Sequence, residues 1–364
     1  MVARLGGDEF AILVRHGADA APGVQMAERV MAALETPFSL HGKTTRVAAS
    51  IGVATLDGTV SDAEEAVRQA DIAMYMAKGM GKACFQVFNS GLHDDMLDRL
   101  ALKGDLRGAA DRGEFVLDYQ PVYDLRTDRI VGMEALVRWS HPTRGLLAPG
   151  AFISIAEDSG EIESIDRFVL ETACRQVRTW QWERPDQRDL WVSVNMSGTH
   201  ISSGRLLADV DRMLGESGLP PTSLVIELTE TALVQQLSQD ACAHLSALRE
   251  RGVRIAIDDF GTGFSSLSYL QRLPVDVLKV DRSFVSGHDA PQQIPLLQTI
   301  VTLGDNLGLT VVAEGIEEPD QQTRLETLGC HYGQGYLLCR PTTPLAITKL
   351  FDSPAPRTVT RSSA

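Results

Sequence analysis

Cysteine is scarce in this sequence, and its spacing excludes a cross-linked or zinc-bound fold. The chain has five cysteines in 364 residues, and no two of them form a CxxC pair. An odd number of scattered thiols is typical of reduced cysteines in the cytosol. The eight histidines are scattered as well and give no sign of a metal cluster.

Positive charge and long hydrophobic runs are also lacking. Lys and Arg number 34 against 48 Asp and Glu, which leaves a net charge of −14 and argues against binding nucleic-acid backbone or anionic lipid. No uncharged apolar run approaches the ~18 residues of a membrane span, and no basic segment precedes an apolar one at the N-terminus as in a signal peptide. We therefore expect a cytoplasmic protein with no membrane segment, whose partner is a small molecule or a divalent cation.

Apolar residues are plentiful, at 44% of a chain long enough for more than one domain. From about residue 115, short runs rich in Val, Ile and Leu alternate with stretches of helical period. The eight strand-like runs are 114–125, 129–139, 189–197, 223–230, 253–260, 276–284, 309–317 and 333–341. This alternation predicts a TIM-like (β/α)8 barrel. Only RTDR joins the first two runs, so the first strand is expected to be antiparallel.

The N-terminal quarter follows another pattern. It contains a hairpin with a Gly-Gly turn in RLGGDEFAILVR, a strand in RVAASIGVATL, and a helix that leads into a last strand. Over 91–112, apolar residues at 92, 96, 97, 100, 102 and 106 lie among charged ones, which predicts a connecting helix. The end of the chain is rich in Ser, Thr and Pro, which predicts disorder. The predicted parts are a partial α+β domain, a connecting helix, the barrel and a disordered tail, at 1–88, 89–112, 113–350 and 351–364.

Polar or acidic residues follow the apolar part of seven barrel strands. Parallel strands of such a barrel bring their C-terminal ends to one rim, so these side chains are expected to converge. Carboxylates that face each other oppose folding unless cations neutralise them, and oxygen ligands favour Mg²⁺ or Mn²⁺. The residues are Glu134, Asn195, Glu227 with Glu230, Asp258 with Asp259, Lys279 with Asp281, Glu314 with Glu317, and Gln334.

The adjacent pair Asp258 and Asp259 is the sharpest signal in this set. One carboxylate could bridge two metals ~3.5–4 Å apart while its neighbour holds the second, an arrangement that clamps both oxygens of a phosphodiester under attack. Lys279 and Asp281 lie two apart, which on one strand puts both on one face and suits the orienting of a water molecule. In the alternative interpretation, each acid at a strand end would be a helix cap or a solvated residue. Asp258 and Asp259 would then cap a helix that begins near Ser265. Seven such strand ends together favour the metal site.

Seven motifs carry these strand-end residues: EALVRW, VNMS, ELTE, DDFGTGFSSLSYL, LKVDRSFV, AEGIE and QGYLLCRP. Together they resemble the bacterial EAL-domain cyclic di-GMP phosphodiesterases, over about residues 97–350. The resemblance implies hydrolysis of cyclic di-GMP to linear pGpG with two Mg²⁺ or Mn²⁺.

The resemblance also implies a role for each of these residues. The first metal would be bound by Glu134, Asn195, Glu227 and Asp258, and the second by Asp258, Asp259 and Glu314. Water would be positioned by Lys279 and Asp281, and a substrate phosphate by Arg138. Glu230 would hold the DDFGTG loop, and Glu317 and Gln334 would support the site.

The N-terminal part resembles the back half of a GGDEF diguanylate cyclase domain, in RLGGDEF, ASIGVA and ADIAMYMAKGMGK. Asp8 would be its metal-side carboxylate, next to Glu9. The remaining metal and guanine residues, and the RxxD inhibitory site, would precede Met1, so we expect no cyclase activity from this chain. Sensory domains of the family lie N-terminal, which fits the cytoplasmic part of a longer sensor protein.

Two other functions remain open at the level of sequence. The barrel could bind cyclic di-GMP without cutting it and signal through the 91–112 helix, although no ligand position is substituted. It could also serve in assembly, because Ser265 to Leu273 resemble the dimer contact of the family. A homodimer through the EAL domain is compatible with hydrolysis, and we expect one.

Overall fold

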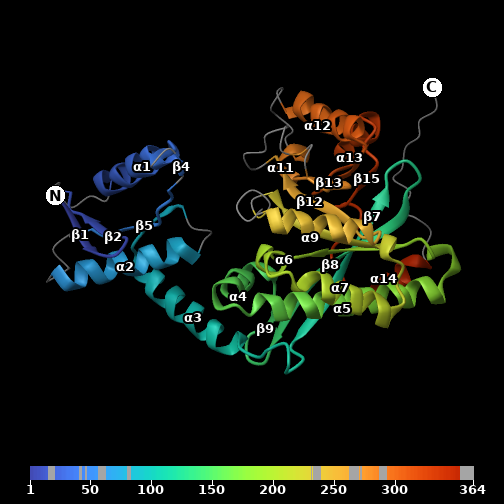
Figure 1. The fold of residues 1–364 in the computed structure, drawn as a ribbon, viewed down its shortest axis with the longest axis horizontal. Helices are drawn as coiled ribbons and strands as arrows, with labels where there is room; N and C mark the ends of the chain where they lie inside the picture. The colour runs from blue at the N-terminus through green and yellow to red at the C-terminus, as the bar shows by residue number, and fades with distance from the viewer. Residues whose placement is uncertain are drawn as a thin grey trace. The chain divides into compact units, whose positions relative to one another are not determined.

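The computed structural model describes most of the chain, in two compact units. The units are Met1–Arg107 with Gly150–Ser159, and Gly108–Pro149 with Gly160–Ala364. None of the helices in the described part is long and apolar enough to cross a membrane. Figure 1 shows the described elements, which occupy residues 1–14, 21–40, 43–45, 47–55, 63–79, 83–230, 232, 239–261, 270, 273–286 and 293–352.

The first unit is built from short sheets and helices. The expected hairpin is present, as antiparallel β1 and β2 with Gly7 in the turn at a φ of 53°. The helix and last strand are present too, and β6 pairs in parallel with β5. The elements are β1 (Val2–Gly6), β2 (Glu9–Ile12), α1 (Ala21–Glu35), β3 (Phe38–Leu40), β4 (Lys43–Thr45), β5 (Ile51–Val53), α2 (Ala63–Gly79), β6 (Phe85–Val87), α3 (Ser90–Leu106) and α4 (Ile153–Ser159).

Helix α3 accounts for most of the predicted connecting segment. It begins where the Asn89 side chain accepts hydrogen bonds from the backbone N–H groups of Gly91 and Leu92, as an N-cap does. Leu92 packs with Ile72 of α2 in a small apolar cluster. The helix ends at Leu106 rather than near 112, because positive-φ Gly108 and the turns after it stop the helical hydrogen bonding.

The second unit is a closed barrel, as predicted. Each strand pairs with the next from β10 to β15, β15 pairs with β7, β7 with β8, and β8 returns to β10. Strand β7 is antiparallel to both of its neighbours, which confirms the hairpin expected from RTDR. The barrel strands are β7 (Phe115–Asp124), β8 (Arg129–His141), β10 (Trp191–Asn195), β11 (Leu224–Thr229), β12 (Arg254–Phe260), β13 (Val277–Val280), β14 (Thr310–Ala313) and β15 (Tyr332–Gly333). Outside the ring, β9 (Gly145–Leu147) pairs with the end of β8.

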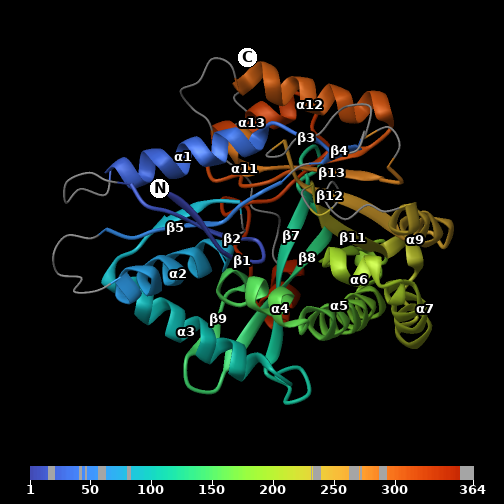
Figure 2. The same ribbon diagram turned by 60° about the vertical axis from the view of Figure 1, so that its left-hand side comes forward.

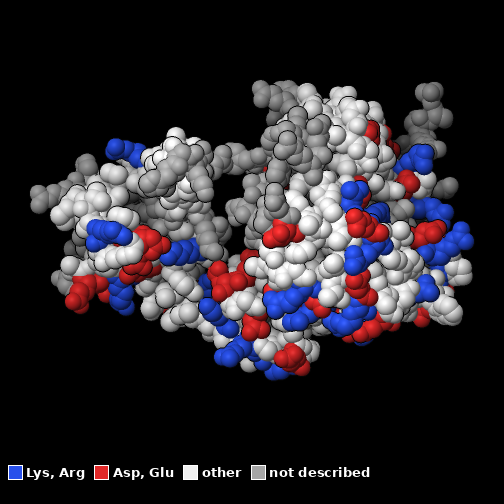
Figure 3. Space-filling model, viewed as in Figure 1, with Lys and Arg blue, Asp and Glu red and all other residues white. Residues whose placement is uncertain are grey.

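Helices cover the outside of this barrel, as Figure 2 shows. On the face in Figure 3, acidic and basic side chains are interspersed. Exposed ion pairs of the barrel unit include Arg251–Asp211 and Arg175–Glu216. The helices are α5 (Ile162–Glu183), α6 (Gly198–Ser202), α7 (Arg205–Ser217), α9 (Gln239–Glu250), α11 (Arg282–Val285), α12 (Gln293–Leu307), α13 (Pro319–Thr327) and α14 (Pro344–Phe351).

The interior of the barrel is layered. An apolar layer is formed by Val122, Trp191, Val225, Ala256, Val277 and Val312. Because side chains along a strand alternate between faces, residues two positions further on point into the barrel as well. On four of these strands they are Glu227, Asp258, Lys279 and Glu314. The same alternation therefore makes a water-excluding floor and places charged groups directly above it.

The last strand is much shorter than the predicted 333–341. Strand β15 covers only Tyr332–Gly333, and the chain then turns, with the N–H groups of Leu338 and Cys339 donating to the carbonyl of Gly335. This segment packs so closely on residue 316 that a Cβ at Gly335 would lie 2.2 Å from the backbone of Ile316. The tight approach replaces a further strand ladder and leaves Gln334 at the end of the barrel.

Candidate active site

Carboxylates from four different strands meet around one lysine at the C-terminal mouth of the barrel. The Nζ atom of Lys279 lies 2.7 Å from Glu227 Oε2, 2.8 Å from Glu314 Oε1, 3.2 Å from Asp258 Oδ1 and 3.4 Å from Glu134 Oε2. The lysine side chain is only 2% exposed. We call Glu134, Glu227, Asp258, Asp259 and Glu314 the acidic cluster; the strand ends do converge.

Burial and mutual repulsion govern protonation in this cluster. Burial raises the pKa of Glu227 well above its usual value, and it raises the pKa of Glu314 to about 8, with Lys279 opposing both shifts. Burial lowers the pKa of Lys279, but the surrounding carboxylates raise it more, so the net shift is upward. The ammonium of Lys279 therefore stays charged, while the raised pKa values of Glu227 and Glu314 favour the protonated form of these two carboxyls.

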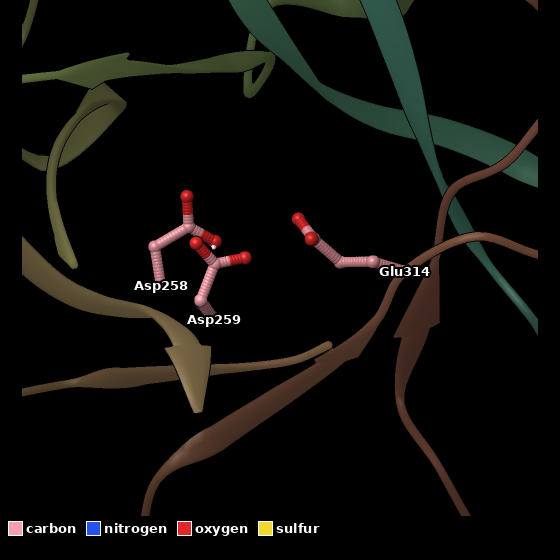
Figure 4. Close-up of side chains that lie close together, drawn as sticks. All are labelled: Asp258, Asp259 and Glu314. Atoms are coloured by element: carbon pink, nitrogen blue, oxygen red, sulfur yellow. Dashed lines mark hydrogen bonds between the residues drawn. The ribbon is translucent and has the colours of Figure 1, made fainter. Parts of the chain in front are cut away.

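Asp258 and Asp259 reach the same cavity although neighbours on a strand ordinarily face opposite ways. Asp259 has a φ of 54°, and the register between β12 and β13 shifts between Ile257 and Phe260. This irregularity turns the second carboxylate back toward the mouth. Oxygen atoms of Asp258, Asp259 and Glu314 all lie within 4.8 Å of one another, and Figure 4 shows the three side chains directed toward a shared space.

Two side-chain amides border the acidic cluster. Asn195 Nδ2 donates to Glu134 Oε1 at 3.1 Å, and Gln334 Nε2 donates to Glu134 Oε2 at 2.5 Å and to Glu314 Oε1 at 3.1 Å. The buried Oε1 of Gln334 has no hydrogen-bond partner among the described residues. An unsatisfied buried acceptor beside carboxylates fits a site that receives a polar or cationic group.

The composition of the acidic cluster fits divalent cations. Its donors are oxygen atoms, which Mg²⁺ and Mn²⁺ prefer. Fully ionised, its five carboxylates exceed the one ammonium by four negative charges, which two divalent ions would neutralise. Glu134, Asn195, Glu227, Asp258, Asp259 and Glu314 are the residues that could hold them.

Two predicted residues lie next to the acidic cluster rather than in it. Glu230 Oε2 accepts the backbone N–H of Gly261 at 2.9 Å and so holds the chain just after β12. Asp281 lies beyond β13, where its Oδ1 accepts the N–H of Ser283 at 3.0 Å and caps α11. Lys279 and Asp281 were expected on one face of one strand, but β13 ends at Val280, so strand alternation does not place Asp281. Burial raises the pKa of Asp259 most, followed by the charges of Asp258 and then Asp281.

Glu317 is exposed, and the structure places it outside the acidic cluster. Its backbone N–H donates to Gln321 at 2.7 Å at the start of α13. Residues 262–269, which include the last two residues of the DDFGTG loop, lie outside the described residues, as does most of the Ser265–Leu273 segment that resembles a dimer contact.

Arg138 lies further out on β8, next to two residues of β7 that sequence reasoning missed. Its Nε lies 2.9 Å from Asp118 Oδ2 on β7, and both side chains are about one-sixth exposed. Gln120, also on β7, donates to the carbonyl of Cys339 at 3.0 Å and pairs in register with Glu134. The alternation of Asp118 and Gln120 along β7 was a signal for both.

Comparison with known proteins identifies the family of this barrel. A sequence profile of the EAL domain matches residues 103–341. The chain belongs to the EAL domain family. A profile of the diguanylate cyclase GGDEF domain matches residues 1–84, ahead of the EAL domain.

Curated relatives are longer than this chain. It is 40% identical over 344 residues to the bifunctional diguanylate cyclase/cyclic di-GMP phosphodiesterase MucR of Pseudomonas aeruginosa, a match covering 93% of this chain and 49% of that protein. It is 38% identical over 352 residues to the cyclic di-GMP phosphodiesterase NbdA of the same species, covering 96% and 44%. The chain thus spans about half the length of these relatives.

Solved structures resemble the EAL domain of this chain. The PaMucR phosphodiesterase in complex with c-di-GMP has 40% identity and a TM-score of 0.64, and the match covers 68% of this chain and 99% of that one. The EAL enzyme Bd1971, bound to cAMP and cyclic di-GMP, has 34% identity and a TM-score of 0.66, covering 70% and 69%. These matches confirm the predicted fold class.

Proposed function

We propose that the EAL domain of this chain hydrolyses cyclic di-GMP to linear pGpG with the help of two Mg²⁺ or Mn²⁺ ions. The observation that carries the proposal is the acidic cluster around Lys279, which offers oxygen ligands from separate strands within one mouth. The cyclic di-GMP phosphodiesterase relatives, and the solved complexes with this ligand, support the choice of substrate.

The proposed reaction opens one phosphodiester of the ring. The oxygen of a water molecule bonds to phosphorus, the bond to the ribose 3′ oxygen breaks, and that oxygen takes up a proton. Divalent ions would make the water more acidic and offset the charge on the phosphate oxygens. Glu134, Asn195, Glu227, Asp258, Asp259 and Glu314 would hold them in place.

Lys279 and Asp281 would divide the orienting work. The ammonium of Lys279 holds Glu227, Glu314 and Asp258 together and so fixes the distances between ligands. Asp281 uses Oδ1 to cap α11, and its second oxygen, which has no hydrogen-bond partner among the described residues, would accept a hydrogen bond from water. Gln334 orients Glu134 and Glu314 through the two bonds of its amide nitrogen.

A product assay tests this proposal. Purified protein is incubated with cyclic di-GMP and Mg²⁺, with and without EDTA, and the nucleotides are separated by chromatography. We expect pGpG with Mg²⁺, none with EDTA, and a loss of at least about a hundredfold in kcat for Glu134→Gln. The matched control is Glu250→Gln, which makes the same change at the exposed last residue of α9 and should retain full activity. Wild-type protein that binds the nucleotide in EDTA but never cleaves it would instead indicate a binding module.

The remaining expectations are proposals of the same kind. We propose a homodimer through the EAL domain, a cytoplasmic location, and hydrolysis rather than cyclase activity for this chain. Sedimentation of the active protein tests the first of these, and a monomer with full turnover would contradict it.

A further inference from the structure

Strands β7 and β8 continue past the barrel as a long antiparallel hairpin, and one face of it leads into the active site. In this register Gln120 pairs with Glu134, Asp118 with Leu136 and Val116 with Arg138. Because side chains on one face of a strand recur every two residues, Asp118 and Arg138 lie on the same face as Glu134, in diagonally adjacent pairs. Arg138 is four positions after Glu134, which is about 13 Å along a strand.

The guanidinium of Arg138 is held at two points. Its Nε lies 2.9 Å from Asp118 Oδ2, and its Nη1 donates to the carbonyl of Val137 at 2.9 Å. A guanidinium has five N–H donors, so three of them, all on the two terminal nitrogens, have no partner among the described residues. Asp118 thus fixes the Nε of the group and leaves N–H groups of the terminal nitrogens for another acceptor.

This arrangement fits a phosphate that lies above the acidic cluster. The planar fork of arginine binds two phosphate oxygens at once, but only in a defined orientation. Ordering a free arginine side chain costs affinity, and an arginine already fixed avoids that cost. The partners are 15% and 16% exposed, so the pair is neither freely solvated nor sealed from a ligand.

We propose that Asp118 is a positioning residue, which orients Arg138 so that its terminal nitrogens bind a phosphate of the cyclic dinucleotide. This inference rests on the proposed function, since it needs that substrate. Asp118 acts through Arg138 and does not touch the reacting atoms. The net charge of the pair is zero, so its contribution is orientation rather than attraction.

A double-mutant cycle tests this role. Asp118→Asn, Arg138→Ala and the double variant are compared in cyclic di-GMP hydrolysis with Mg²⁺ and in nucleotide binding with EDTA. We expect Asp118→Asn to raise KM and Kd by about tenfold while kcat stays within about twofold. In the Arg138→Ala background the same change should have no further effect. Asp118→Glu should recover part of the loss, because it restores the charge.

The control is a surface pair of the same kind. Asp211 lies 2.7 Å from the Nε of Arg251, so Asp211→Asn removes a matched ion pair and should leave KM unchanged. An equal KM increase from Asp118→Asn with and without Arg138 would overturn the inference, and so would a lower KM. Wild-type protein without turnover would overturn the proposed function instead. Thermal unfolding of each variant shows whether a loss reflects unfolding.

Discussion

Apolar strand residues are buried in the barrel unit but exposed in the first hairpin of the other unit. In the barrel, β12 buries Ile255, Ala256 and Ile257 almost completely. In the β1–β2 hairpin of the first unit, Val2 is 69% exposed and Phe10 is 64% exposed. Both sequences favour strands, so strand propensity does not decide burial. A strand loses contact with water on both faces only where helices cover one face and a closed interior fills the other.

Removing the charge of Lys279 should affect the barrel most. Lys279→Met leaves the acidic cluster without its cation, and breaking a buried pair in this way costs about 3–5 kcal/mol in the free energy of unfolding. Urea unfolding in EDTA measures the loss, and Mg²⁺ should restore part of it. Arg251→Met, in an exposed pair, should cost less than about 1 kcal/mol. Similar losses for both variants would contradict the central role of the lysine.

The stability of the barrel should also depend on pH when no metal is bound. A carboxyl whose pKa is raised stabilises the folded state below its usual pKa, near 4.5, and loses that contribution as pH rises through about 8, as for Glu314. Lys279, with its raised pKa, stays charged throughout this window. We expect unfolding in EDTA to become easier by about 3 kcal/mol from pH 5 to pH 8. Mg²⁺ should reduce the dependence, and a rise in stability over this range would contradict it.

A glycine in each unit gives a smaller, sharper contrast. A Cβ at Gly132 on β8 would lie 2.2 Å from the Trp191 ring, so Gly132→Ala overpacks the barrel and should cost about 1–3 kcal/mol. A Cβ at Gly104 in α3 would meet nothing within 4 Å, so Gly104→Ala should stabilise by about 0.4–1 kcal/mol. Thermal unfolding of both variants measures the opposite signs. Shifts in the same direction would show that this packing difference does not govern stability.

The smallest effect is expected in the hairpin itself. Phe10 is already largely exposed, so Phe10→Ser should change the unfolding free energy by less than about 0.5 kcal/mol and leave the kcat of hydrolysis unchanged. Phe115, on β7, is 4% exposed, and Phe115→Ser should cost several times more. If Phe10→Ser proved as costly as Phe115→Ser, the hairpin would have to be covered in solution.

Much of the barrel could be predicted from local pattern. The short RTDR connection sufficed for the antiparallel first strand, because four residues cannot span a parallel crossover. The strand ends of Glu134, Glu227, Asp258 and Glu314 sufficed for their convergence, because the rim of a barrel is a consequence of its topology.

What local pattern could not supply was distance across the barrel. Lys279 lies at the centre of the carboxylates, a position that depends on the register of β13 with the strands that carry them. Asp118 depends in the same way on the register of the β7–β8 hairpin. The last strand was overestimated because the close approach of Gly335 to Ile316 is a tertiary contact with no periodic signature.

The ammonium at the centre of the mouth has a consequence for how this protein matures. Many metalloproteins complete their folding only when the metal arrives, because their ligands repel one another without it. Here the chain carries a cation of its own, Lys279, within 3.4 Å of four of the carboxylates proposed as ligands. Under the proposed function, the barrel would assemble while divalent ions are scarce and take them up afterwards, so that metal supply would set when it becomes active rather than whether it folds.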